Sequence, residues 1–243
     1  MRSQAAALKA LLDEPRLQVM PGCGDGMGAR LIEEAGFRTG FVSGSSVSAM
    51  RLAMPDMDLV SFNEMADAVE SCIAAAPNVL WLADGDTGHG NALAVQRVVR
   101  AYARRGAAAV LIEDKIWPRP LGRDGAKLVV EREHAILRCR AAVEACRDEG
   151  ILLLARTDAR VSRGFDEALV RVRAFVAEGA DICFSTRRNR KRRCAPGSRP
   201  APANRRLRSP HRPSSTASAS ESWSTRKTFS PPVCGRCAMH WPG

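Results

Sequence analysis

The residues best suited to chemistry follow a run of apolar residues, Val79–Ala83. The segment DGDTGHGN, residues 84–91, comes directly after this run. Two carboxylates separated by one residue on extended backbone point in the same direction. At the end of a buried strand they make a hard, anionic oxygen site that suits Mg²⁺. We therefore expect Asp84 and Asp86 to bind this metal.

A second interpretation of the same segment needs no ligand. Short runs of Asp and Gly are common in loops, where they simply end a strand. Asn91 is also a good N-cap for a helix that begins at Ala92. The segment alone leaves both interpretations open.

Polar residues follow the other apolar runs as well. They are Asp25, Ser43–Ser46, Glu113 with Asp114, and Arg156 with Asp158. The run 43–46 offers a row of hydroxyls and backbone amides. These residues need a fold that brings successive strand ends together.

Strand-like and helix-like segments alternate along the first part of the chain. The expected strands are 17–20, 40–42, 79–83, 108–112, 151–155 and 180–184. The expected helices are 2–14, 26–35, 61–76, 92–105, 132–148 and 165–178, with a capping box at Ser61 and Glu64. Short connections between alternating strands and helices predict a parallel sheet.

The position of the polar residues distinguishes a barrel from an open sheet. A (β/α)₈ barrel gathers its chemistry where all the strands end, whereas a doubly wound sheet uses mainly one switch point. Here polar residues follow several successive strands, and no Gly-x-Gly-x-x-Gly turn follows the first one. The predicted fold class is α/β of the (β/α)₈ TIM-barrel type, incomplete because the expected strands end at 180–184.

Residues 185–243 differ in composition from residues 1–184. They carry 14 of the 37 Lys and Arg residues and one of the 26 Asp and Glu residues. The first 184 residues keep 23 basic and 25 acidic residues, so the net charge of +11 comes from the tail. We divide the chain into a partial barrel, 1–184, and a basic Arg/Pro/Ser-rich tail, 185–243, that is disordered or frame-shifted.

Two interpretations of the tail remain. It is either a disordered segment that binds nucleic-acid phosphates through Arg187–Arg193, or the product of a coding frame lost near Phe184. We favour frame loss because the break falls before a barrel is complete. Cys234 and Cys237 form a lone C-x-x-C pair without the second pair of a zinc site.

The remaining composition favours a cytoplasmic protein. No apolar run approaches the length of a membrane span, and residues 1–12 lack the apolar core of a secretory signal. The eight cysteines are scattered rather than arranged as a disulfide framework. We expect Cys72, Cys139 and Cys146, which lie in helical patterns, to be buried reduced thiols.

A set of motifs in this order resembles the isocitrate lyase/phosphoenolpyruvate mutase superfamily. The motifs are SGSS at 43–46, MPD at 54–56, DGDTGHGN at 84–91, IEDK at 112–115 and ARTDAR at 155–160. The resemblance extends from about Gln18 to Phe184. It implies an α/β barrel that makes or breaks C–C or P–C bonds next to an α-oxo or α-hydroxy acid, usually through an enolate intermediate.

The resemblance also implies roles for particular residues. Carboxylates that hold Mg²⁺, directly or through water, match Asp84, Asp86 and Glu113, with Asp56 nearby. Groups that hold the substrate's carboxylate match Ser43, Gly44, Ser45 and Arg156.

One loop departs from the lyase branch of the superfamily. That branch carries a K-[KR]-C-G-H motif, whereas Arg119–Arg123 here reads RPLGR, with Leu121 in place of the cysteine. Leucine transfers no proton, so this loop fits the decarboxylases, hydrolases and mutases better. Two interpretations of its arginines stay open. Either Arg119 or Arg123 closes over the substrate, or both are solvated side chains on a flexible loop. His89 is interpreted as pocket lining rather than as a general base.

These observations predict a Mg²⁺-dependent enzyme that cleaves a C–C bond, as a lyase or decarboxylase, in a small carboxylic acid. Its catalytic candidates are Arg156, Asp56, Arg119 and Arg123. The alternatives are a phosphonopyruvate- or phosphoenolpyruvate-type mutase or hydrolase, nucleic-acid binding through the tail, and an inactive truncated product. The resemblance implies a homo-oligomer, but the exchanged helix that joins subunits in the family has no counterpart in this sequence.

Overall fold

The computed structural model describes residues 4–120 and 128–186. Its strands are β1 (Gly22–Cys23), β2 (Thr39–Val42), β3 (Leu80–Asp84), β4 (Ala109–Glu113), β5 (Leu152–Thr157) and β6 (Ile182–Ser185). Its helices are α1 (Gln4–Leu12), α2 (Gly26–Glu34), α3 (Gly44–Leu52), α4 (Phe62–Ala75), α5 (Ala92–Arg104), α6 (Arg132–Glu149), α7 (Ala159–Ser162) and α8 (Phe165–Glu178). The predicted alternation of strands and helices is therefore confirmed.

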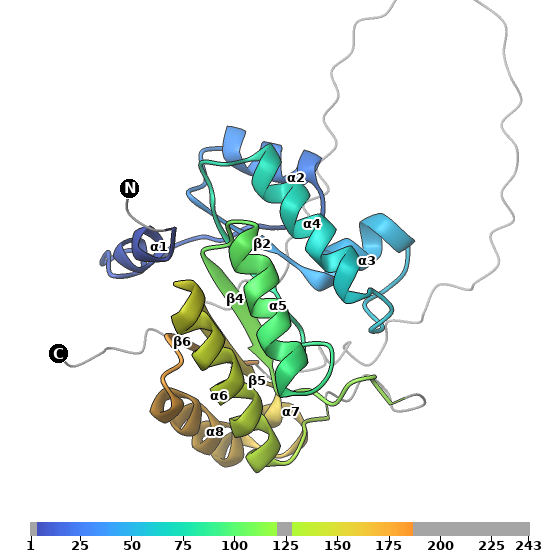
Figure 1. Ribbon diagram of the computed structural model, residues 1–243, viewed down its shortest axis with the longest axis vertical. Coiled ribbons are helices and arrows are strands. Elements are labelled where there is room, and N and C mark those ends of the chain that lie inside the picture. Colours follow the sequence, from blue (N-terminus) through green and yellow to red (C-terminus); the bar gives the residue numbers. More distant parts are fainter. Residues whose placement is uncertain (1–3, 121–127, 187–243) are drawn as a thin grey trace, which may run out of the picture. The chain divides into compact units, whose positions relative to one another are not determined.

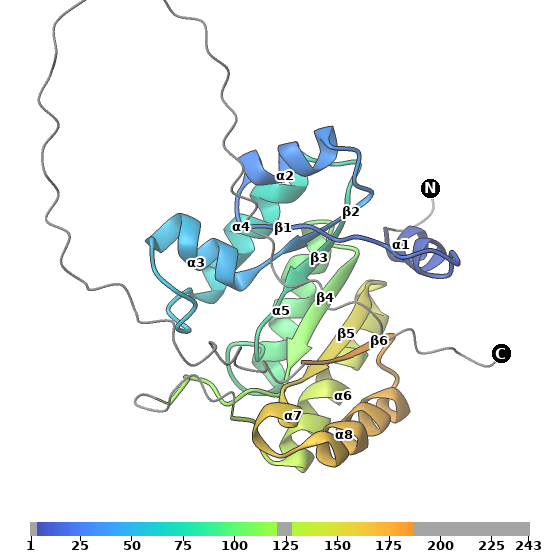
Figure 2. The ribbon, with the colours of Figure 1, turned by 180° about the vertical axis from the view of Figure 1, so that it is seen from behind.

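The strands form one parallel sheet in the order β1-β2-β3-β4-β5-β6. An open doubly wound sheet reverses its strand order at a switch point, whereas a barrel adds each new strand beside the last. The observed order is that of a barrel, as predicted. Helices α4, α5 and α6 cover one face of the sheet (Figure 1), and the strands are seen from the opposite side (Figure 2).

Strand β3 is buried on both faces, which explains why its residues are apolar without alternation. Trp81 belongs to the large core between the sheet and the outer helices, and its Nε1 donates to the carbonyl of Ala76 at 3.0 Å. Leu82 belongs to a smaller cluster with Leu8 of α1 on the other face. The ring of Trp81 packs on Gly40 of β2, where any Cβ would overlap it.

The predicted first strand is wrong. Residues 17–20 are not a strand, and β1 is instead a pair of residues between that segment and the predicted helix 26–35. Leu17 is 81% exposed, so its apolar side chain does not contribute to the sheet. The pairing of Gly22 with Phe41 and of Cys23 with Val42 defines the true edge of the sheet.

Two short helices were not predicted from the sequence. Helix α3 begins within the serine-rich run that follows β2, with Ser43 as its N-cap residue. Helix α7 follows β5 directly. The capping box of α4, in contrast, is confirmed, because Ser61 and Glu64 bind each other's backbone amides.

The described cysteines, Cys23, Cys72, Cys139, Cys146 and Cys183, are free thiols, as expected. Among residues 4–120 and 128–186, no helix has the length and apolar character required to cross a bilayer. The expectations for the tail beyond Thr186, including Arg187–Arg193 and the Cys234/Cys237 pair, lie outside the described residues.

Candidate active site

The carboxylates of Asp84 and Asp86 face the first turn of α3. Asp84 Oδ2 accepts a hydrogen bond from the amide of Gly44 at 3.0 Å, and Asp84 Oδ1 accepts one from the amide of Asp86 at 3.1 Å. A Cβ atom on Gly44 would lie 3.3 Å from Asp84 Oδ2 and 3.4 Å from Asp86 Oδ2. Both carboxylates therefore lie against the backbone of Gly44, which has no side chain.

The reason for this convergence differs from the one the sequence indicated. Strand β3 ends at Asp84, and Asp86 has a left-handed backbone with φ of 48°, so the pair does not lie on continuous extended backbone. The end of β4 stabilises the turn at Asp86, because the amide of Glu113 donates to the carbonyl of Asp86 at 2.8 Å. The hydroxyl of Tyr102 also donates to the carbonyl of Asp84 at 3.1 Å.

Burial and mutual repulsion make these carboxylates reluctant to ionise. Burial, reinforced by the charge of Glu113, raises the pKa of Asp84. Burial and the charges of Asp84 and Glu113 raise the pKa of Asp86 well above its usual range. A cation bound between them would offset this repulsion and favour the ionised form.

Both oxygens of the Glu113 carboxylate contact cationic side chains. Its Oε1 lies 3.0 Å from Lys115 Nζ, and its Oε2 lies 3.1 Å from Nη1 of Arg156. Glu113 and Arg156 are register partners on the adjacent strands β4 and β5, which explains this contact. Arg156 also pairs with Asp158 at 2.9 Å, so its guanidinium is fixed from two sides.

The carboxylates of Asp84 and Asp86 fit Mg²⁺ as direct ligands, and the expected part of Glu113, directly or through water, stays a prediction. Within residues 4–120 and 128–186, no group of three or more His, Cys, Asp or Glu side chains is arranged to hold a metal. Both oxygens of Glu113 face cations. Mg²⁺ commonly takes one or two carboxylates and completes its shell with water and substrate oxygens. Asp84 and Asp86 meet that requirement.

The expected substrate-binding residues lie beside the two carboxylates. Ser43 and Ser45 bring their hydroxyls within 2.9 Å of each other at the start of α3. The helix N-terminus carries a partial positive charge that favours anions. The amide of Gly44, however, is already bound to Asp84.

The remaining predicted residues lie at the edge of the site. Arg119 Nη2 lies 3.5 Å from Asp56 Oδ2, and Asp56 is itself 46% exposed. Arg123, predicted as a second loop arginine, lies outside the described residues.

Sequence reasoning missed two charged residues, Asp58 and Lys115. Their side chains are 3% and 5% exposed, and Lys115 Nζ lies 2.9 Å from Asp58 Oδ1. Although burial opposes it, the charges of Glu113 and Asp86 raise the pKa of Lys115. Lys115 could have been found from the sequence, because it belongs to the IEDK motif. Asp58 could not, because it lies outside the MPD motif, two residues after Asp56.

His89 belongs to an aromatic group beside these residues. Its ring centroid lies 6.0 Å from that of Phe62 and 6.4 Å from that of Trp117. Burial lowers the pKa of His89, which favours the neutral imidazole. Its Nε2 is buried without a hydrogen-bond partner.

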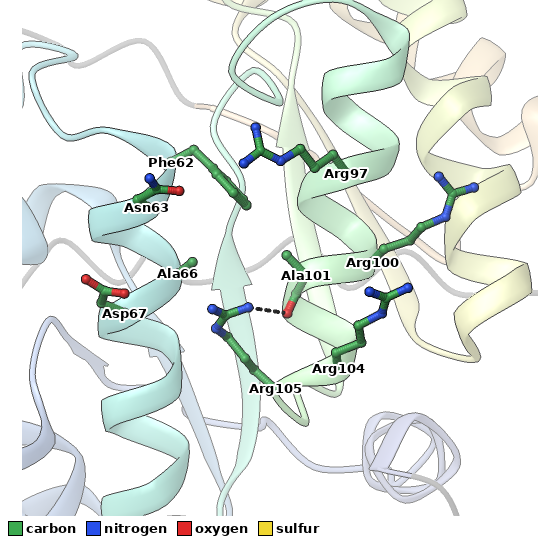
Figure 3. A pocket seen from close by; sticks show the side chains of 9 residues that line it. All are labelled: Phe62, Asn63, Ala66, Asp67, Arg97, Arg100, Ala101, Arg104 and Arg105. Carbon is green, nitrogen blue, oxygen red and sulfur yellow. Dashed lines mark hydrogen bonds between the residues drawn. The ribbon is translucent and has the colours of Figure 1, made fainter.

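A separate hollow of about 680 Å³ lies between α4 and α5. It is lined by Phe62, Asn63, Ala66, Asp67, Arg97, Arg100, Ala101, Arg104 and Arg105 (Figure 3). Arg97 lies over the Phe62 ring at 4.6 Å, and Arg105 donates to the carbonyl of Ala101 at 3.1 Å. The hollow shares none of the predicted site residues, and we assign no chemistry to it.

A family model described as phosphoenolpyruvate phosphomutase matches residues 8–196. The chain is 41% identical over 174 residues to the petal death protein of Dianthus caryophyllus, covering 72% of this chain and 55% of that protein. It is 37% identical over 180 residues to 2,3-dimethylmalate lyase of Eubacterium barkeri, covering 74% and 62%. The chain thus spans between about half and two-thirds of the length of these relatives.

The fold is also similar to that of solved structures. Phosphonopyruvate hydrolase in complex with oxalate and Mg²⁺ matches with a TM-score of 0.69 and 31% sequence identity, covering 77% of this chain and 64% of that one. A protein of similar fold has thus been solved with both a dicarboxylate and Mg²⁺ bound.

Proposed function

The chain belongs to the phosphoenolpyruvate phosphomutase family, within the isocitrate lyase/phosphoenolpyruvate mutase superfamily, and on that premise we propose that it acts on a small α-oxo or α-hydroxy carboxylic acid with the help of Mg²⁺. The reaction that we propose is cleavage of a C–C bond, as in a lyase or a decarboxylase, through an enolate intermediate. The observation that carries this proposal is the convergence of the Asp84 and Asp86 carboxylates on Gly44, beside the pair of Glu113 and Arg156.

Asp84 and Asp86 would hold the metal, with Glu113 acting through water. When bound, Mg²⁺ would supply Lewis-acid stabilisation to the oxygens of the acid as negative charge develops on them. The phosphonopyruvate hydrolase structure supports this choice of ion, because it combines Mg²⁺ with oxalate on a similar fold.

Arg156 is the residue best suited to bind the acid's carboxylate. Its guanidinium is fixed between Glu113 and Asp158, so little conformational freedom is lost when an anion binds. Ser43 and Ser45 would orient the same group from the start of α3. Asp56 and Arg119 would act from the rim, where they already contact each other.

The choice between C–C and P–C chemistry depends on the relatives. The name of 2,3-dimethylmalate lyase supports C–C cleavage, whereas the family description and phosphonopyruvate hydrolase support a mutase or hydrolase as the alternative. Nucleic-acid binding through Arg187–Arg193, the frame-loss hypothesis, oligomerisation and a cytoplasmic location stay predictions.

A substrate panel tests the proposal. The full chain is incubated with oxaloacetate, 2,3-dimethylmalate or phosphonopyruvate, with Mg²⁺ or with chelator, and pyruvate and other products are followed by NMR. We expect turnover of a C–C substrate that stops with chelator and in Asp84→Ala, and that persists in Asp13→Ala, an exposed surface control. Turnover that is indifferent to chelator, or absent with every acid, would contradict the proposal.

A further inference from the structure

Asp58 combines a strained backbone with a buried charge. It lies in the connection between α3 and α4 and has a φ of 61°, in the left-handed region that residues other than glycine rarely adopt, although Asp and Asn tolerate it better than most. Its carboxylate is nevertheless only 3% exposed. Residues held in such a conformation persist where surrounding contacts impose it, and they concentrate at functional sites.

The contacts that hold Asp58 come from a single neighbouring segment. Its Oδ1 accepts from Lys115 Nζ at 2.9 Å, and its Oδ2 accepts from the backbone amide of Arg119 at 2.7 Å. The Arg119 guanidinium adds a longer contact of 3.4 Å through Nη2. One carboxylate thus fastens the segment after β4 to the connection between α3 and α4.

These contacts continue into the candidate active site as a chain of alternating charges. We call the series Arg119, Asp58, Lys115, Glu113 and Arg156 the charge chain. Its successive contacts measure 3.4, 2.9, 3.0 and 3.1 Å. Asp58 occupies the position between the two cations of the loop, which would repel each other without it.

Arg119 retains a donor that the protein does not use. Its Nε is buried and has no hydrogen-bond partner, although its Nη2 contacts both Asp56 and Asp58. Nε itself is closed to solvent, but the Arg119 side chain as a whole is 22% exposed. An arginine held in place at the rim, with part of its side chain exposed, is suited to an anionic group that arrives from outside.

We propose that Asp58 is a positioning residue that holds Lys115 and Arg119 at the mouth of the site and thereby orients Arg119 toward the anionic end of the substrate. The effect on substrate rests on the proposed function, whereas the fastening of the two segments does not. A purely structural Asp58 would change stability alone. A positioning Asp58 also changes the binding of the acid, because Arg119 loses its fixed orientation.

Three variants separate the charge from the strain. Asp58→Asn keeps a side chain that tolerates the left-handed backbone but removes the ion pairs. Asp58→Gly relieves the strain and removes every side-chain contact. Ala53→Gly is the matched control, because Ala53 has a similar φ of 52° in the same connection and carries no charge.

Hydrogen exchange tests the fastening without any activity. We expect the Arg119 amide to exchange about tenfold faster or more in Asp58→Gly than in the wild type, since its acceptor is lost. We expect no change at this amide in Ala53→Gly. Unchanged exchange of the Arg119 amide in Asp58→Gly would overturn the proposal, whether or not the protein is an enzyme.

Kinetics test the effect on substrate. In Asp58→Asn we expect KM for the acid to rise about tenfold, the loss typical of one hydrogen bond to a charged group, while kcat changes much less. Ala53→Gly keeps both values. An unchanged KM in Asp58→Asn would refute the positioning role. If the wild type turns over no acid, the proposed function fails, and the exchange measurement alone decides whether Asp58 fastens the loop.

Discussion

Arg171 Nη1 donates to Asp114 Oδ2 at 3.0 Å, and the two side chains are 0% and 1% exposed. Asp114 also accepts from the Thr157 hydroxyl at 2.6 Å and from the amide of Asp158 at 2.9 Å. Helix α8 is thereby linked to the ends of β4 and β5, close to the residues that flank Arg156. This buried pair therefore helps to hold in place the strand ends that carry the candidate site.

Replacing Arg171 alone should be strongly destabilising. Arg171→Met leaves Asp114 buried without its cation, and breaking a buried pair in this way costs about 3–5 kcal/mol of unfolding free energy. Urea denaturation measures the loss. Adding Asp114→Asn should recover part of it, since the stranded charge is then removed. A loss below about 1 kcal/mol in Arg171→Met would mean that the pair contributes little.

The stability of the fold should fall in acid because of Glu167. Hydrogen bonds from Arg132 and Arg171 lower the pKa of Glu167 to about 2, compared with about 4.3 in an unfolded chain. A lowered folded-state pKa stabilises the protein above the unfolded pKa, and this contribution is lost as pH falls from about 4.3 to about 2. We expect Glu167→Gln to flatten the pH dependence of the unfolding midpoint in that window. An equally steep dependence in the variant would contradict this assignment.

A methyl group on Gly44 should harm ligand binding more than folding. The added Cβ would lie 3.3 Å from Asp84 Oδ2 and 3.4 Å from Asp86 Oδ2, in the space that the carboxylates share. Alanine is favoured over glycine in a helix by up to about 1 kcal/mol, which offsets part of the crowding. We expect Gly44→Ala to bind oxalate about tenfold more weakly, by calorimetry, with a melting temperature near that of the wild type. Unchanged oxalate affinity would show that ligands do not enter this space.

Much of the fold was predictable because its determinants are local or periodic. The buried strands β3, β4 and β5 carry continuous apolar runs, and α8 begins and ends where its sequence indicated. The edge of the sheet was not predictable in this way. Leu17 and Val19 are as apolar as core residues, but they are 81% and 49% exposed, and only tertiary contacts determine which apolar runs are covered.

The candidate site was predictable where the residues lie at the ends of strands. Asp84, Glu113 and Arg156 each end or follow an apolar run, so their approach follows from the parallel order of the strands. Asp58 was not predictable, because nothing in its spacing from Asp56 indicates which carboxylate turns inward. A left-handed backbone at Asp58 decides this, together with cations from a segment about 60 residues away along the chain.

The proposed chemistry depends most directly on a divalent cation held by Asp84 and Asp86. Calorimetric titration of Mg²⁺ into the full chain, in the presence of oxalate, measures this binding without requiring turnover. We predict one Mg²⁺ per chain, affinity weakened about tenfold or more in Asp84→Asn, and wild-type affinity in Asp13→Asn. A wild-type chain that binds no Mg²⁺, or an Asp84→Asn chain that binds it equally well, would contradict the account.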